Sequence, residues 1–131
     1  MGTRAVYVFE DDHDQVAVYK HYDNYPQGAT HFINNAKKYA WKFPRFEADE
    51  FGAAFVVANK DDGGGVRLIP PYKDHDELMD VYAYCDFFYF VKFKDGDLQI
   101  RIMGEESGVM TLTQMKALHF NISKEGCLLC I

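Results

Sequence analysis

The chain has 131 residues, of which 48% are hydrophobic and 16% aromatic, and its formal net charge is -6 at pH 7. A chain of this length can bury roughly two thirds of its unfolded surface, so the sequence predicts a single domain spanning residues 1–131. The negative charge argues against direct binding to nucleic acid, because proteins that bind phosphate backbones usually present a basic face. Aromatic side chains in this number must lie in the core or at a contact surface.

Composition also bears on location. No apolar segment is long enough to span a bilayer, and the N-terminus begins with an alternating strand pattern rather than with a secretion signal. The three cysteines are an odd number, which fits a reducing compartment where Cys85 is a small buried hydrophobic side chain. We therefore expect a cytoplasmic protein that makes no contact with a membrane.

The first part of the chain predicts a hairpin followed by two helices. Residues 3–10 and 15–22 are rich in Val, Tyr and Phe and flank a polar turn, which is typical of a β-hairpin whose paired positions sum to about 25. From residue 29 to 42 apolar residues recur every three or four positions, which indicates a helix. A second helix is expected from Glu47, because acidic residues in its first turn suit the positive end of a helix dipole.

The second part predicts further strands. Residues 61–65 should form a loop because adjacent glycines disfavour regular structure, and 66–69 should form a short edge strand. The segment 81–93 has the densest β pattern, and a hairpin turn connects it to an alternating strand at 98–103. A loop at 104–108 and a terminal helix from residue 111 complete the predicted elements.

This order of elements predicts the fold class. Strands that follow one another through short connections, with helices between and after them, favour an α+β fold. We expect a two-layer sandwich in which an antiparallel sheet of about four or five strands carries the helices on one face.

The strand expected at 81–93 has aromatic side chains on both faces. Alternation assigns Phe87, Tyr89 and Val91 to the core face. The opposite face would then present aromatic rings beside acidic loops, and such rings are enriched at the centres of protein interfaces. With one tyrosine from the turn after the hairpin, the predicted binding surface comprises Tyr25, Tyr82, Tyr84, Phe88 and Phe90.

The segment from Tyr19 to Pro26 brings together side chains that are capable of chemistry. On a strand, His21 and Asp23 would share one face, and a histidine beside a carboxylate is the minimal pair for general acid–base catalysis. Arg4 on the neighbouring hairpin strand would face His21 and act as an anion partner. The same residues also suit a turn, because Asp and Asn bond to their own backbone and Pro fixes a backbone angle. Both interpretations remain open at this stage.

Other motifs predict no metal, nucleotide or covalent chemistry. The histidines lack ligand spacing such as two residues four apart on a helix, so we predict no metal site. The glycine run lacks the Lys and Ser/Thr of a phosphate loop, and no nucleophile motif is recognisable, so we expect no cofactor. Cys127 and Cys130 have the spacing of a zinc or redox pair without further ligands, and we expect this tail to pack on the domain or on a neighbouring subunit.

Two motifs lie at the ends of the predicted hairpin. They are Gly2-Thr3-Arg4-Ala5 at the start of a strand and Tyr19-x-His21-x-Asp23-x-Tyr25-Pro26 before a helix. Together they resemble a small, functionally uncharacterised protein family associated with bacteriophages and prophages. The resemblance covers residues 1–60 and also the strand that begins at Asp86. Relatives often have Gly in place of Asn24, and Asn, like Gly, tolerates a left-handed backbone. It implies an origin in a mobile element and no particular reaction, and the positions it marks are Arg4, His21, Asp23 and Tyr25.

These observations support a leading hypothesis and an alternative. We predict a non-enzymatic, acidic protein-binding domain, encoded by a phage or mobile element, that inhibits a host defence or DNA-processing protein. If that host protein binds nucleic acid, the acidic clusters would occupy its basic groove in place of DNA. The alternative is a small enzyme of unknown reaction that uses His21 and Asp23 as an acid–base pair, with Arg4 beside them. Homodimer formation through the aromatic face is compatible with both.

Overall fold

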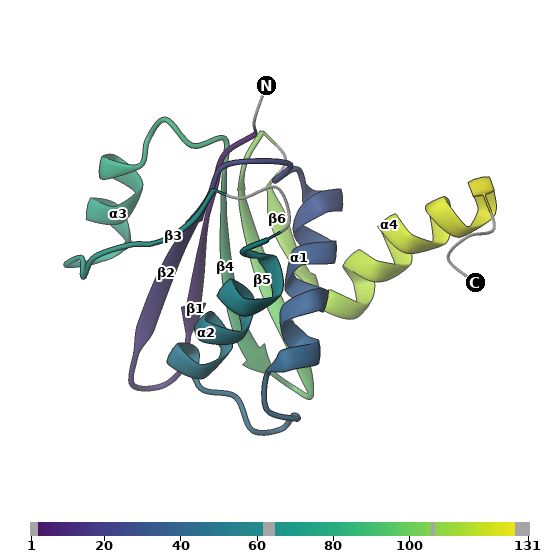
Figure 1. Ribbon diagram of the computed structural model, residues 1–131, viewed down its shortest axis with the longest axis horizontal. Helices are drawn as coiled ribbons and strands as arrows, with labels where there is room; N and C mark the ends of the chain where they lie inside the picture. Colours follow the sequence, from purple (N-terminus) through teal and green to yellow (C-terminus); the bar gives the residue numbers. More distant parts are fainter. Residues whose placement is uncertain (1–2, 62–64, 106, 128–131) are drawn as a thin grey trace.

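The protein forms one six-stranded sheet with helices on both faces (Figure 1). The computed structural model describes residues 3–61, 65–105 and 107–127, with side chains up to residue 119. The strand order is β3-β2-β1-β4-β5-β6, in which β1 and β4 are parallel and all other neighbours are antiparallel. The elements are β1 (Ala5–Glu10), β2 (Gln15–Lys20), α1 (Pro26–Tyr39), α2 (Ala48–Asn59), β3 (Val66–Leu68), α3 (His75–Val81), β4 (Phe87–Lys94), β5 (Asp97–Gly104), β6 (Gly108–Thr111) and α4 (Leu112–Cys127).

The predicted α+β, two-layer architecture is confirmed, with three differences in detail. The sheet has six strands because Gly108–Thr111 pairs with β5, where the sequence predicted a loop that ends at residue 108 and a helix that starts at residue 111. It is mixed rather than antiparallel, because the connection from β3 through α3 passes over β2 and β1 and places β4 parallel to β1. The short helix α3 lies on the face of the sheet opposite to α1 and α2 (Figure 1).

The first hairpin forms as predicted. Ala5 pairs with Lys20 and Tyr7 with Val18, so paired positions sum to the expected value. Helix α1 starts at Pro26, earlier than the expected residue 29, because a proline without an N–H group fits the first turn of a helix.

One face of the sheet packs on α1, α2 and α4 and forms the main core. Tyr7 from β1 lies 4.6 Å from the ring of Phe55 and 5.1 Å from the ring of Tyr89. Phe9 contacts both Phe51 and Phe55, at 5.3 Å in each case. The aromatic residues of this face therefore interlock across the sheet and α2. The predicted core positions of β4 are confirmed, because Tyr89 is fully buried with its neighbours on this face.

The opposite face carries a second, smaller core under α3. Leu78 of α3 is 1% exposed and packs with residues of β1, β2 and β4. The expected strand at 81–93 is wrong at its start, because residues 75–81 form α3 and the strand begins at Phe87. The expected exposure of its second face is also wrong for Phe88 and Phe90, which are 8% and 2% exposed.

Helix α4 leaves the body of the protein after its first turns (Figure 1). Its start packs on α1 and β5, where Leu112 and Met115 are buried. Cys127 is its last residue, and Cys130 lies outside the described residues, as does the predicted packing of the tail. Across the described ranges, no helix combines the length and apolar character needed to cross a membrane.

Candidate functional site

The turn between β2 and α1 is anchored by one buried side chain, Asn24. Its Oδ1 accepts a hydrogen bond of 2.7 Å from the Tyr7 hydroxyl, and its Nδ2 donates to the carbonyls of Thr3 and Lys20 at 2.8 and 2.9 Å. The Tyr89 hydroxyl donates to the Asn24 carbonyl at 2.6 Å. Because buried polar groups are costly when unpaired, this network fixes the turn against β1 and β4.

The backbone of this turn depends on its neighbours. Asp23 has a φ of 63°, so the left-handed residue is Asp23 and not Asn24. The following helix approaches the turn closely, since a Cβ atom at Gly28 would lie 1.9 Å from the carbonyl oxygen of Asp23. Glycine is therefore required at position 28 on steric grounds. Asp23 itself is exposed.

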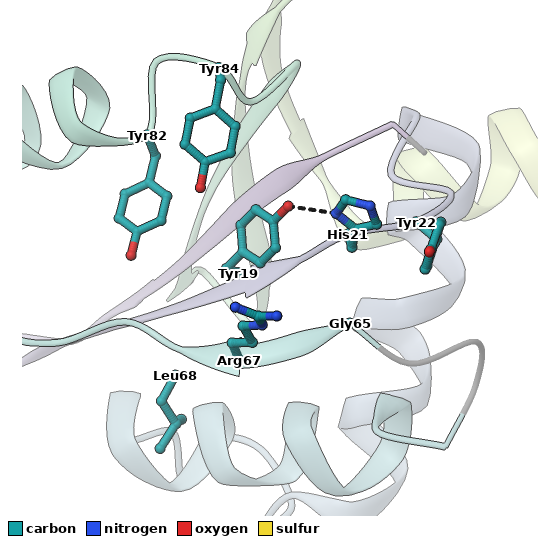
Figure 2. A pocket seen from close by; sticks show the side chains of 8 residues that line it. All are labelled: Tyr19, His21, Tyr22, Gly65, Arg67, Leu68, Tyr82 and Tyr84. Atoms are coloured by element: carbon teal, nitrogen blue, oxygen red, sulfur yellow. Dashed lines mark hydrogen bonds between the residues drawn. The ribbon is translucent and has the colours of Figure 1, made fainter. Parts of the chain in front are cut away.

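A cleft of about 730 Å³ opens on the face of the sheet that carries α3, between β2, β3 and the turn that follows α3 (Figure 2). Tyr19 pairs directly with Arg67 across β2 and β3, so both side chains project from the same face. Gly65 has a φ of 79° and a Cβ there would lie 2.6 Å from the Cβ of His21, so glycine lets β3 begin close to His21. The cleft is lined by Tyr19, His21, Tyr22, Gly65, Arg67, Leu68, Tyr82 and Tyr84.

His21 is oriented by a tyrosine. Its Nδ1 lies 2.7 Å from the Tyr19 hydroxyl, and the edge of its ring meets the Tyr22 ring at 4.5 Å (Figure 2). Burial raises the pKa of Tyr19, so its hydroxyl keeps its proton at neutral pH. When that hydroxyl donates to Nδ1, the neutral imidazole carries its hydrogen on Nε2.

The predicted pairing of His21 with Asp23 does not form. Strand β2 ends at Lys20, so the alternation that would place both side chains on one face stops before Asp23. The partner of His21 Nδ1 is Tyr19, two positions earlier on the same face of β2. The spacing of Tyr19 and His21 was a usable signal in the sequence, whereas Arg67 joins them only through the pairing of β3 with β2.

The cleft is lined by one arginine in an acidic chain. None of the eight described residues that line it is Asp or Glu, although the chain has 20 acidic and 14 basic residues. Arg4 lies at the rim, with its guanidinium 5.8 Å from the Tyr84 ring and its backbone N–H bonded to Asp86. Burial raises the pKa of Tyr84, while the charges of Arg4 and Arg67 act in the opposite direction. Both arginines therefore lie close enough to interact electrostatically with the Tyr84 hydroxyl.

The residues of the predicted binding surface separate in the structure. Tyr82 and Tyr84 line the cleft, and Tyr84 is 56% exposed. Tyr25 is also exposed, but it lies at the N-cap of α1 with its ring 5.9 Å from that of Phe87. Phe88 and Phe90 are buried beneath α3 and belong to the second core.

Hydroxyl, imidazole and guanidinium groups converge here with no Asp or Glu among the described lining residues, and such groups can donate several hydrogen bonds to an oxyanion. In the part of the chain that the structure describes, no group of three or more His, Cys, Asp or Glu side chains is placed to hold a metal ion. Comparisons with protein-family profiles, curated proteins and solved structures find no match to this chain. Function is therefore inferred from the geometry of the cleft.

Proposed function

We propose that the protein binds a small anionic molecule in the cleft between β2, β3 and the turn after α3. The observation that carries this proposal is the local reversal of charge: Arg67 lines the cleft and Arg4 flanks it, with the His21 imidazole as a further donor, in a chain of net charge -6. A guanidinium offers several N–H donors in a planar fork, which suits carboxylate and phosphate groups. An anion would be attracted to this cleft and repelled by most of the remaining surface.

The shape and chemistry of the cleft support a small ligand. Its volume of about 730 Å³ lies within the range of small-molecule sites. The Tyr84 hydroxyl keeps its proton at neutral pH and can donate to a ligand, since desolvation raises its pKa. The His21 ring is held by Tyr19 and Tyr22, so this donor loses little conformational entropy when a ligand binds.

The test is a titration of the protein with inorganic phosphate and with sulfate at low salt, followed by NMR shifts of backbone amides. We expect the largest shifts at Tyr19 to Tyr22 and at Gly65 to Leu68. Replacing Arg67 with Gln should weaken binding about tenfold, the order expected for one charge-assisted hydrogen bond.

The matched control is Arg101→Gln. Arg101 is exposed on β5, and β2, β1 and β4 separate that strand from β3. At about 4.8 Å per strand, its backbone lies about 19 Å from that of β3. Equal affinities of the two variants for both anions would refute the proposal.

A second candidate function is enzymatic, with His21 as the acid–base group and Tyr19 in the orienting role that the sequence assigned to Asp23. It is favoured by the 2.7 Å contact between the Tyr19 hydroxyl and His21 Nδ1, which leaves Nε2 for proton transfer. Turnover of a bound ligand would be followed by ³¹P NMR. Product that forms with the wild type and not with His21→Gln, while that variant still binds the ligand, would identify an enzyme. A ligand that stays intact with both proteins would identify a binding protein.

We also retain as a proposal that the protein is a phage or mobile-element accessory factor that binds a host protein, including one that binds DNA. Support comes from an acidic edge, where Glu10 Oε1 and His75 Nε2 lie 2.8 Å apart and join the acidic turn after β1 to the acidic start of α3. Asp12, Asp14 and Asp76 are exposed along this edge. A host protein captured by the wild type should be lost when these three residues are changed to Asn, and should persist with Arg67→Gln.

A further inference from the structure

We infer that the anion held in the cleft is the phosphate of a free nucleotide, and that the base of this nucleotide stacks on Tyr84. The inference rests on the proposed function and adds the chemical class of the ligand. It is carried by the layout of aromatic and cationic side chains along the cleft.

The lining side chains of the cleft are arranged around Tyr19 (Figure 2). Tyr82 and Tyr84 lie on one side of Tyr19, Arg67 lies on its other side on β3, and His21 and Tyr22 lie at a third side. A ligand whose anionic group meets Arg67 therefore extends toward an aromatic surface. Mononucleotides combine an anionic group and a planar ring in this way.

The ring that can stack on the ligand is identified by exposure and spacing. The rings of Tyr19, Tyr82 and Tyr84 lie 6.0 to 6.3 Å from one another and are tilted by 34° to 50°. A base sandwiched between two parallel rings would need about 7 Å, twice the stacking distance, so it must lie on an outer face of this cluster. Tyr19 is 8% exposed and Tyr84 is 56% exposed, which selects Tyr84.

The donors around Arg67 favour phosphate over a planar carboxylate. The guanidinium, the imidazole of His21 and the hydroxyl of Tyr84 approach from different elements, namely β3, the end of β2 and the turn before β4. A phosphomonoester has three terminal oxygens that can accept from donors on several sides. Stacking of a base on an aromatic side chain adds about 1–3 kcal/mol.

The net charge of the chain distinguishes a free nucleotide from a nucleic acid. A polymer would carry many phosphates past the exposed acidic residues, whereas a mononucleotide brings one phosphate group to a cleft without a carboxylate. The ligand of this cleft is therefore a mononucleotide and not the terminus of a strand.

The test is isothermal titration of the folded protein with the four common nucleoside 5′-monophosphates, ribose 5-phosphate, adenosine and a 5′-phosphorylated trinucleotide. We expect at least one mononucleotide to bind about tenfold more tightly than ribose 5-phosphate, in line with one stacking contact. Tyr84→Leu should remove this advantage, whereas Tyr84→Phe, which loses the hydroxyl and keeps the ring, should retain it. Arg67→Gln should weaken both, and Tyr39→Leu, which changes a tyrosine that is 62% exposed on α1, should weaken neither.

The outcomes separate this inference from the function on which it rests. If ribose 5-phosphate binds as tightly as every mononucleotide, or if Tyr84→Leu changes nothing, the nucleotide is excluded and the anion-binding cleft stands. Tighter binding of the trinucleotide than of any mononucleotide would assign the site to a nucleic-acid end and overturn the inference. If no phosphate compound binds the wild type more tightly than Arg67→Gln, the inference and the proposed function both fail.

Discussion

The two faces of the segment from Tyr19 to Asn24 lie in different surroundings. Lys20 and Asn24 are fully buried on the side of α1, where Asn24 joins the turn to β1 and β4. Tyr19 and His21 point the other way and line the cleft beside Arg67. The crowding of polar and aromatic residues in this segment therefore serves two surfaces, one in the core and one in the cleft to which we assign the proposed binding. Substitutions on the first face should change stability, and substitutions on the second should change binding.

The largest effect is expected for Asn24→Ala. The substitution removes the acceptor of the buried Tyr7 hydroxyl and one hydrogen bond each from the carbonyls of Thr3 and Lys20, which should cost about 4 kcal/mol. Urea unfolding followed by circular dichroism measures this loss. His21→Gln on the opposite face should change the free energy of unfolding by less than about 1 kcal/mol. Similar losses for the two variants would remove the distinction between the faces.

Gly28→Ala should follow, with a loss of about 3 kcal/mol. Its new Cβ atom would lie 1.9 Å from the backbone oxygen of Asp23, so the helix or the turn must shift. Gly108→Ala is the matched control, because no atom lies within 4 Å of a Cβ built at that position. A loss below about 1 kcal/mol for Gly28→Ala would show that the turn is not held rigidly against α1.

The buried hydroxyl of Tyr7 predicts a fall in stability at alkaline pH. Burial, and then the neighbouring Tyr89, raise the pKa of Tyr7 well above its ordinary value, and burial also raises the pKa of Tyr72 to about 12. Above pH of about 10 the unfolded chain releases these protons first, so the free energy of unfolding should fall by about 1.4 kcal/mol per pH unit for each group. Below that pH the contribution is fully present.

Tyr7→Phe isolates this effect. It should cost about 1.5 kcal/mol at pH 7, through the lost hydrogen bond to Asn24. Between pH 10 and 12 the free energy of unfolding should also fall less steeply with pH, because one tyrosine fewer contributes. Denaturant unfolding at pH values from 7 to 12 measures both quantities. An unchanged slope would mean that Tyr7 ionises as easily in the folded protein as in the unfolded chain.

The smallest effect is expected for Asp23→Gly. Asp23 is exposed with a positive φ, so glycine should stabilise the turn by up to about 1 kcal/mol. Anion binding in the cleft should not change, because Asp23 does not line it. Tyr19→Phe removes the hydroxyl that orients His21 and should weaken anion binding. If anion binding is instead lost with Asp23→Gly and kept with Tyr19→Phe, the result would favour the pairing of His21 with Asp23 that the sequence predicted.

Local patterns in the sequence predicted the parts of the fold that depend on near neighbours. The register of the first hairpin followed from its turn, and the core face of β4 followed from alternation. Helix α3 was missed because seven residues are too few to be helical alone; it depends on the cap by Asp74 and on burial of Leu78. Tyr82 and Tyr84 happen to fall two residues apart, in step with the alternation of β4. The predicted strand was therefore extended back into the turn.

Only part of the cleft could be predicted, because local patterns in the sequence identify only near neighbours. Tyr19 lies near the end of β2 and His21 follows two residues later, so their proximity was encoded locally. Arg67 reaches them through the pairing of β3 with β2 and Tyr84 through the docking of α3, both of which join positions far apart in the chain. The parallel pairing of β1 with β4 is equally non-local. Alternation and composition carry no information on such long-range neighbours.

Helix α3 is the shortest helix described, and the turn that follows it supplies one wall of the cleft. It is held to the sheet mainly through Leu78 and through the contact of His75 with Glu10. Opening of this helix would cost less than global unfolding and would take Tyr82 and Tyr84 away from Arg67. Ligand occupancy and the docking of α3 are thus thermodynamically linked, so a bound ligand should slow amide hydrogen exchange at residues 75–85 more than elsewhere in the protein.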